Sequence, residues 1–366
     1  MQLYPSLITE ALATVRYPGT GKNIIESGMV EDDIRIDGDS VSFTLIFDKP
    51  TDPFMRSLVK SCEAAIRTHI SPEVKVTVNT ASRQPAKPKA APILPGVKNI
   101  VGISSGKGGV GKSTVAANLA VALAREGYKV GLLDADIFGP SMPKMFGIED
   151  EQLYVRDDEG GRQLIMPVER YGVKILSIGF LVDRDKAVMW RGSMASNALK
   201  QLITEADWGE LDYFLIDMPP GTSDIHLTLV QTLAMTGVVV VTTPQEVALA
   251  DARKGIAMFM DEKVNVPILG LVENMAYFTP AAHPDERYYI FGREGGIRLA
   301  EKLGVRLLAQ IPLVASIAES GDAGEPIAMA DTITGHAFAH LAHETVDAVA
   351  ERNDTLPPTQ KVELKH

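Results

Sequence analysis

Cysteine is nearly missing from this sequence, and long apolar runs are missing altogether. Cys62 is the only cysteine among 366 residues, so no intramolecular disulfide can form, and a reducing, cytoplasmic location is expected. The longest strongly apolar run, residues 237–241, is far shorter than the roughly 20 residues that a membrane helix needs. The first 19 residues lack the basic and apolar regions of a secretory signal. The sequence therefore predicts neither a membrane span nor an export signal.

Positive charge is in the minority. The chain has 36 Lys and Arg against 47 Asp and Glu, which gives a formal net charge of −11 at pH 7. Non-specific binding to nucleic acid or to an anionic membrane depends on a basic surface. The charge balance argues against both partners, although it leaves room for a local basic patch. Apolar residues make up 45% of the chain, which is enough for a sizeable core, and the length suits two domains.

A proline-rich stretch divides the chain. Its prolines, spaced by Ala and Lys, are Pro85, Pro88, Pro92 and Pro95. This composition favours an extended chain over a packed core. We interpret residues 81–98 as a linker between a small domain of residues 1–80 and a larger domain of residues 99–350; an ordered arm on the larger domain is the alternative. Residues 351–366 are polar and are expected to form a frayed tail.

The two domains show different patterns. Residues 1–80 predict a small α+β unit with helices at 5–15 and 54–70 and strands at 34–36, 41–47 and 74–78. The larger domain alternates apolar strands with helices, its strands ending at the segments NIVGISSG, KVGLLDAD, YFLIDMPPG, VVVVTTPQE, ILGLVENM and RLLAQIPL. This order is typical of an α/β fold with a mostly parallel, doubly wound sheet, in which ligands bind at the carboxyl ends of the strands.

A phosphate-binding loop follows the first of these strands. Its nine residues, all expected to bind the nucleotide, are Gly106, Lys107, Gly108, Gly109, Val110, Gly111, Lys112, Ser113 and Thr114. They contain the pattern G-x-x-x-x-G-K-[ST] between a strand and a helix, which is the context that a P-loop requires. The backbone amides would cradle the phosphates. Lys112 would reach the β- and γ-phosphates, and Ser113 would hold Mg²⁺; a chance glycine-rich turn is the alternative.

The early lysine of this loop is informative. The segment K-G-G-x-G-K-[ST] resembles the deviant Walker A motif of the MinD/ParA class of P-loop NTPases. In that class the first lysine reaches the nucleotide of a partner subunit. The resemblance therefore implies a homodimer with ATP at its interface and a catalytic role for Lys107, whereas a solvated loop lysine is the alternative.

Two acidic motifs end later strands. Asp134 and Asp136 close the strand KVGLLDAD, and the resemblance implies that Asp136 orients the attacking water; simple capping is the alternative. Asp217 ends the run FLID, a Walker B pattern whose Asp binds Mg²⁺. Residues 219–222 follow as a stiff loop, and Asp224 is interpreted as the N-cap of the next helix.

Two residues are expected near the base. Asn274 in LVENM and Pro312 in QIPL match the positions that contact adenine in the same class. An amide side chain pairs well with the adenine edge, which supports the assignment of Asn274. Taken alone, either residue is more typical of an ordinary turn.

Further motifs extend the resemblance. The segments DADIFGPS, WRGSM, IDMPPGTSD, TTPQEVALAD, ENMAYF and FG-x-x-GG follow the P-loop in this order. Over residues 100–330 they closely resemble the Mrp/ApbC family of iron–sulfur cluster carrier ATPases, and residues 1–80 resemble the small domain of bacterial Mrp proteins. The resemblance implies an ATP-hydrolysing factor for iron–sulfur cluster assembly or transfer, with assembly or client proteins as partners.

The chain departs from this family in its cysteines. The family usually carries C-x-x-C between the ENM and FG segments, but residues 276–290 contain none. Thiolates are the usual ligands of iron–sulfur clusters, so the resemblance implies a cluster whose usual ligands this chain lacks. We interpret Cys62 as a buried structural residue. His283, Asp285 and Glu286 are interpreted as solvated, with weak metal ligation as the alternative.

Two functions of different kinds remain open. One is an iron–sulfur cluster assembly or transfer ATPase, and the other is an ATP-controlled dimerisation switch that positions a partner and carries no cluster. A MinD-like membrane switch would need a basic amphipathic C-terminal helix, which residues 351–366 do not provide. With either function we expect ATP and Mg²⁺ as cofactors and slow intrinsic hydrolysis, because a dimer or a client must complete the site.

Overall fold

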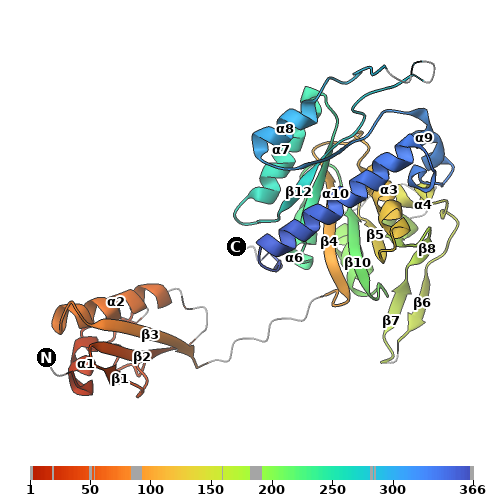
Figure 1. The fold of residues 1–366 in the computed structure, drawn as a ribbon. Coiled ribbons are helices and arrows are strands. Elements are labelled where there is room, and N and C mark those ends of the chain that lie inside the picture. Colours follow the sequence, from red (N-terminus) through yellow and green to blue (C-terminus); the bar gives the residue numbers. More distant parts are fainter. Residues whose placement is uncertain are drawn as a thin grey trace. The chain divides into compact units, whose positions relative to one another are not determined.

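The computed structural model divides into two compact units, Met1–Ala90 and Ala91–His366. The described residues are 3–18, 20–48, 52, 54–83, 93–158, 160–181, 192–280, 283 and 286–362. Residues 84–92 of the predicted linker, Asp285, and residues 190–191 of the WRGSM motif lie outside them. Each unit has a sheet of its own, as Figure 1 shows.

The small unit is a three-stranded sheet with two helices. Its elements are α1 (Pro5–Leu12), β1 (Arg35–Asp37), β2 (Ser40–Phe47), α2 (Met55–His69) and β3 (Lys75–Ser82). β1 and β2 form a hairpin that turns at Gly38, whose φ of +58° favours glycine, and β3 pairs with β2 in parallel. Leu58, Cys62 and Ile66 bury one face of α2 in the core of this unit. The predicted small α+β fold is confirmed.

Element boundaries differ from the prediction at both sides of the linker. β3 continues to Ser82, because β2 offers backbone partners as far as Phe47, which pairs with Ser82. The next strand begins at Val97, which pairs with Leu211 of a neighbouring strand. Both ends of the predicted linker are therefore strand. In the small unit the first helix ends at Leu12, three residues earlier than predicted.

The large unit is built on an eight-stranded sheet. In sheet order, its strands are β13 (Leu307–Gln310), β12 (Ile268–Glu273), β11 (Gly237–Thr242), β4 (Val97–Ser105), β10 (Leu211–Asp217), β5 (Val130–Asp134), β9 (Val173–Ser177) and β8 (Val168–Arg170). Neighbouring strands pair in parallel except for β8 at the edge, which is antiparallel to β9. The predicted mostly parallel sheet is confirmed, and β4 lies between β11 and β10.

Helices cover both faces of this sheet. They are α3 (Lys112–Arg125), α4 (Met142–Met145), α5 (Gly192–Thr204), α6 (Asp224–Thr232), α7 (Glu246–Met260), α8 (Gly295–Leu303), α9 (Ala315–Asp322) and α10 (Ile333–Thr355), with short 3₁₀ turns η1 (Ile178–Leu181) and η2 (Ile327–Met329). Figure 1 shows α3 and α10 side by side. None of the helices in the described residues combines the length and the apolar character that crossing a bilayer requires.

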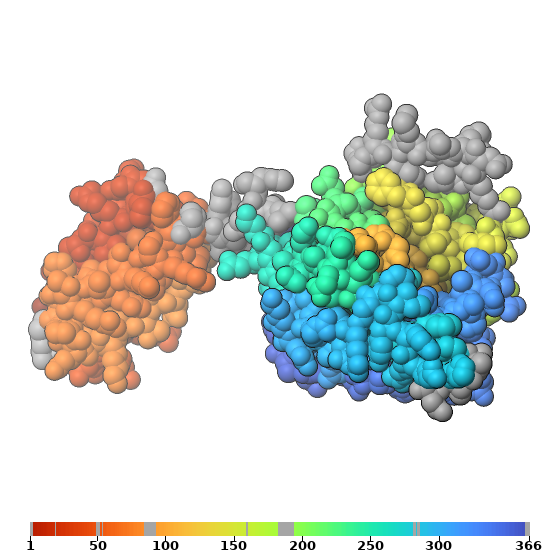
Figure 2. Space-filling model, turned by 90° about the horizontal axis from the view of Figure 1, so that it is seen from above, coloured from red at the N-terminus to blue at the C-terminus, as the bar shows by residue number. Residues whose placement is uncertain are grey.

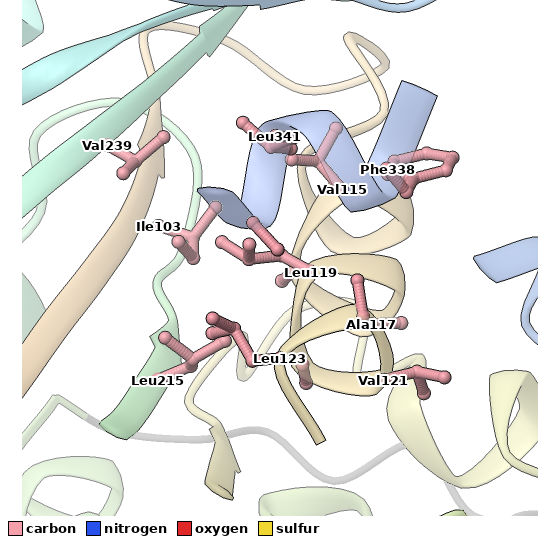
Figure 3. Close-up of a cluster of buried hydrophobic side chains, with 14 of the residues drawn as sticks. Ile103, Val115, Ala117, Leu119, Val121, Leu123, Leu215, Val239, Phe338 and Leu341 are labelled. Carbon is pink, nitrogen blue, oxygen red and sulfur yellow. The ribbon is translucent and has the colours of Figure 1, made fainter. Parts of the chain in front are cut away.

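Alternate residues of the central strands point to opposite faces of the sheet. Ile103, Leu215 and Val239 share a core with α3 and α10 (Figure 3). Phe214 and Val238, one position away on the same strands, share a second core with α5, α6 and α7. Because both faces are buried, these strands contain runs of successive apolar residues, such as 213–216 in β10 and 238–241 in β11. The sheet is therefore doubly wound, as predicted.

Residues 142–210 contain elements that the sequence analysis did not predict. A separate antiparallel hairpin, β6 (Tyr154–Asp157) and β7 (Gln163–Met166), precedes β8 and β9. The four residues of β6 are all exposed, and the sequence YVRD does not alternate apolar and polar residues. A strand this short without alternation gives no pattern that sequence reasoning can detect.

The C-terminal residues differ from the frayed tail that was predicted. α10 continues to Thr355, five residues past position 350. Beyond it, the Thr359 hydroxyl donates to the Ala234 carbonyl at 3.1 Å, and the amide of Val362 donates to the Val230 carbonyl at 3.1 Å. The segment 356–362 is therefore held against the large unit.

Candidate functional site

The P-loop spans the gap between β4 and α3, and its glycines are required by geometry. Gly111 has a φ of +81°, and a Cβ at this position would lie 2.2 Å from Nδ2 of Asn274. A Cβ at Gly106 would lie 2.1 Å from the backbone carbonyl carbon of Asp251 in α7. At Gly106 the clash is with backbone, and at Gly111 the contact adds to a positive φ that other residues rarely adopt, so glycine is favoured at both positions. The backbone is thereby free to present its amides to a phosphate at the start of α3.

A cavity of about 290 Å³ opens over this loop. Its lining residues are Ser105, Lys107, Gly108, Gly109, Gly111, Lys112, Ser113, Thr114, Asp136, Gly139, Ser141, Met145 and Pro220. The structure thus brings most of the predicted P-loop residues together with Asp136 and with the loop after β10. In Figure 2, the orange surface of the large unit comes from the part of the chain around the P-loop. It lies between yellow and teal surfaces, which come from later parts of the chain.

Lys112 is buried between two carboxylates. Its Nζ lies 2.6 Å from Oδ1 of Asp217 and 3.5 Å from Oδ2 of Asp136. The Lys112 side chain is 6% exposed and that of Asp217 is fully buried, so the pair is well shielded from solvent. Nζ also lies 3.2 Å from the hydroxyl of Ser113. The predicted phosphate ligand and the two predicted acidic residues therefore form one cluster at the carboxyl ends of β5 and β10.

Asp217 has an unused oxygen. Its Oδ2 is buried and has no hydrogen-bond partner among the described residues. Burial raises the pKa of the Asp217 carboxyl, and the contact with Lys112 opposes this shift. A free carboxylate oxygen beside the Ser113 hydroxyl fits Mg²⁺, which takes oxygen ligands and keeps much of its water. The two residues predicted to hold the metal therefore suit it.

Asp134 performs a task that the sequence analysis missed. It is fully buried, and its Oδ2 accepts hydrogen bonds from the amides of Ser141 and Met142 and from the hydroxyl of Ser177 at 2.9–3.1 Å. Burial, together with the nearby charge of Asp217, raises the pKa of Asp134 to about 7. Asp134 thus fixes the loop that carries Asp136 onto β9. Ser177 is 43 residues away from Asp134 in the sequence, so no local sequence pattern predicts this contact.

The loop after Asp217 is closed by His226. The N-cap of α6 is Ser223, and the prediction of Asp224 as the cap is wrong by one residue. Nδ1 of His226 accepts a hydrogen bond from the Ser223 amide at 3.1 Å, as the last residue of a capping box does. His226 is fully buried, and burial lowers its pKa to about 4. This histidine, to which the sequence analysis gave no role, is therefore neutral and holds residues 219–223 in place.

Asn274 supports the P-loop directly. Its Nδ2 donates to the carbonyl of Val110 at 2.8 Å, and its side chain is buried against Gly111. Pro312 follows β13, where the next amide, that of Leu313, donates to the Tyr277 carbonyl at 2.7 Å. Asn274 therefore lies against the P-loop, whereas Pro312 follows the edge strand β13. Their predicted contacts with adenine stay predictions.

The cysteine-free loop shows no cluster site in its described residues. His283 and Glu286 are exposed, with 3.7 Å between Nδ1 and Oε1. No group of three or more His, Cys, Asp or Glu that suits a metal ion is found in the described part of the chain. Cys62 is completely buried in the small unit, and burial raises its pKa to about 12. Its interpretation as a buried structural residue is confirmed, and it stays a neutral thiol at physiological pH.

Both units of the chain are similar to known proteins. Residues 96–349 match the family model described as NUBPL iron-transfer P-loop NTPase, and residues 6–80 match the model of an iron-sulfur cluster assembly protein. The iron-sulfur cluster carrier protein of Synechocystis sp. is 44% identical over 343 residues, which cover 92% of this chain and 96% of that relative.

Two solved structures share the fold of the large unit. A nucleotide-binding protein from Archaeoglobus fulgidus in complex with ADP is 40% identical, with a TM-score of 0.55 over 64% of this chain and 89% of that one. The septum site-determining protein MinD from Pyrococcus horikoshii, complexed with Mg-ADP, is 26% identical, with a TM-score of 0.51 over 69% of this chain and 98% of that one. The predicted resemblance to MinD-like P-loop NTPases is confirmed.

Proposed function

The chain belongs to the family of NUBPL iron-transfer P-loop NTPases, and on that premise we propose that it is a Mg²⁺-dependent, slowly turning-over ATPase that acts in iron–sulfur cluster assembly or transfer. The observation that carries the proposal is the buried cluster of Lys112, Asp217 and Asp136 below a glycine-rich phosphate cradle. The relative solved with Mg-ADP supports the metal.

Each residue of the cluster has a task in this proposal. Lys112 would exchange its contact with Asp217 for the β- and γ-phosphates, while Ser113 and Asp217 would hold Mg²⁺, which would supply charge neutralisation at the phosphate oxygens. Asp136 orients a water for attack on the γ-phosphorus, so that the bond from that phosphorus to the bridging oxygen breaks and ADP and phosphate form. Thr114 and the loop amides bind the phosphates, and Asn274 and Pro312 contact the base.

Lys112→Ala tests the nucleotide site. The variant removes the cation that balances the phosphates, so calorimetric titration with Mg-ATP should show an affinity reduced by at least roughly ten-fold. Lys254→Ala, which changes an exposed lysine of α7, is the matched control and should bind as the unchanged protein does. Equal affinities in the two variants would remove the central claim.

We also propose a homodimer with ATP at its interface. Lys107 lines the open cavity over the P-loop, half-buried, whereas Lys112 is already engaged within the subunit. If a second copy of the chain faced this cavity, Lys107 of the first copy would reach the nucleotide that the second copy binds. The completed site then needs ATP, Mg²⁺ and a partner, so isolated subunits should hydrolyse ATP slowly.

In this proposal an iron–sulfur cluster is cargo and not a resident cofactor. Cys62 is neutral and buried in the small unit, and residues 276–290 offer no thiol. Oxygen and imidazole are poor substitutes for thiolate, so the isolated protein should retain little iron and sulfide after reconstitution and desalting, and Cys62→Ser should retain the same. A stoichiometric cluster that survives desalting and is lost in Cys62→Ser would contradict this.

The lack of an available thiolate also favours a second candidate function. A chain without a thiolate of its own is equally suited to act as an ATP-controlled switch that positions a cysteine-bearing partner. Transfer assays distinguish the two functions: a cluster-handling factor accelerates cluster delivery to a recipient apoprotein when external thiols are supplied, whereas a positioning switch has no effect unless its partner is present.

A further inference from the structure

A second cavity, of about 400 Å³, lies at the end of the large sheet opposite the P-loop. Met235 and Val266, which precede β11 and β12, line it, whereas the P-loop follows the carboxyl end of the parallel strand β4. Leu233 at the end of α6 adds to the apolar wall. This volume is within the range of small-molecule sites.

The C-terminal segment 356–362 forms one side of this cavity and is fixed in place. Hydrogen bonds from Thr359 and Val362 to the end of α6 hold the segment, and Nη2 of Arg352 donates to the carbonyl of Pro357 at 2.8 Å. This side of the cavity is therefore formed by chain that is held in place.

The cavity is cationic in a protein of net negative charge. Lys263, Arg352 and Lys361 line it, and none of its described lining residues is acidic. Arg352 is only 8% exposed, its Nη1 donates to the amide oxygen of Asn353, and its buried Nε has no partner among the described residues. A buried guanidinium without a carboxylate is costly, because its lost hydration is not replaced.

We propose that this cavity binds a small organic anion with one carboxylate on a short apolar body. Arg352 lines the cavity and its guanidinium supplies the charge that attracts the carboxylate, and Lys263 and Lys361 add favourable charge at the opening. Leu233, Met235 and Val266 receive the apolar body. An inorganic anion leaves that wall uncovered, and an uncharged apolar molecule leaves Arg352 without a counter-ion.

Octanoate is the probe for this site, titrated calorimetrically into the full-length protein. We expect saturable binding to one site per chain, with octanol and inorganic phosphate each bound at least roughly ten-fold more weakly. Arg352→Met keeps the side-chain length without the charge and should weaken octanoate binding by at least roughly ten-fold, and Lys361→Met should weaken it less. Arg253→Met, an exposed arginine of α7 exchanged in the same way, should change nothing.

Three results would overturn the proposal. They are the absence of octanoate binding, binding of octanol as tight as that of octanoate, and unchanged affinity in Arg352→Met. If Arg352→Met does not fold, the octanoate affinity of Lys361→Met serves as the test. An unchanged affinity in that variant would show that the cationic opening does not contribute to binding, and it would overturn the proposal. None of these measurements depends on ATP, so failure here leaves the nucleotide site untouched.

Discussion

His226 should make the large unit sensitive to acid. Its imidazole is fully buried, with a pKa lowered by burial from 6.5 to about 4, and its Nδ1 must stay unprotonated to accept the Ser223 amide. The variant His226→Gln keeps a hydrogen-bond acceptor at this position of the capping box, but it does not titrate. Comparing the two proteins isolates the histidine.

The sign and size of the effect follow from these pKa values. Between pH 6.5 and pH 4, His226 is mostly protonated in the unfolded chain and mostly neutral in the folded chain. The free energy of unfolding therefore falls as the pH falls towards 4. A shift of this size should cost the protein about 2 kcal/mol at pH 5 and about 3 kcal/mol at pH 4, relative to pH 8. Asp134, with its raised pKa, acts in the opposite direction over the same range, but both proteins retain it.

Urea unfolding at pH 8, 5 and 4 measures the effect. Trp190 and Trp208, the two tryptophans of the chain, both belong to the large unit, so their fluorescence reports its unfolding. The unchanged protein should lose more stability with acid than His226→Gln does, by the amounts above. If the two proteins lose stability in parallel from pH 8 to pH 4, His226 is not a buried neutral tether and the reasoning fails.

Three further predictions concern the nucleotide loop. Lys107→Ala should bind Mg-ATP but fail to dimerise with it, as light scattering will show; an ATP-dependent dimer in this variant would refute the action of Lys107 across the interface. Asp136→Ala should bind ATP, hydrolyse it at least roughly a hundred-fold more slowly and accumulate as the ATP-bound dimer, and hydrolysis at the unchanged rate would show that another residue orients the water. Gly111→Ala should lose ATP binding because its Cβ meets Asn274, whereas Gly127→Ala, which carries only the backbone strain of roughly 1–2 kcal/mol, should still bind ATP in calorimetry.

Local motifs explain why the centre of the site was predictable. The P-loop is continuous in sequence, and its conformation is set by its own glycines. Asp136 and Asp217 come from different segments, but each follows a buried strand of the same parallel sheet, and the carboxyl ends of such strands meet at one edge. The proximity of both to Lys112 therefore followed from the order of strands and helices.

Contacts between distant segments account for what was missed. Asp134 owes its role to Ser177 on β9, and the sequence around Ser177 contains no motif. His226 lies only a few residues after the loop of residues 219–222, yet its burial depends on the packing of α6 against α5 and α7. The tail beyond Thr355 is polar by composition and is held by hydrogen bonds that involve backbone carbonyls, which any sequence could offer.

The central position of β4 has a mechanical consequence. The chain enters the large unit through this strand, which pairs with β10 from Val97 to Ile103 and with β11 from Val101 to Ser105. A pull on the chain before Val97 acts along the strand, so it loads both ladders of hydrogen bonds in shear, and these must break together. A motor that draws in the chain from its N-terminal side would therefore stall at the strand that carries the P-loop, and the loop would keep its geometry until the middle of the sheet gave way.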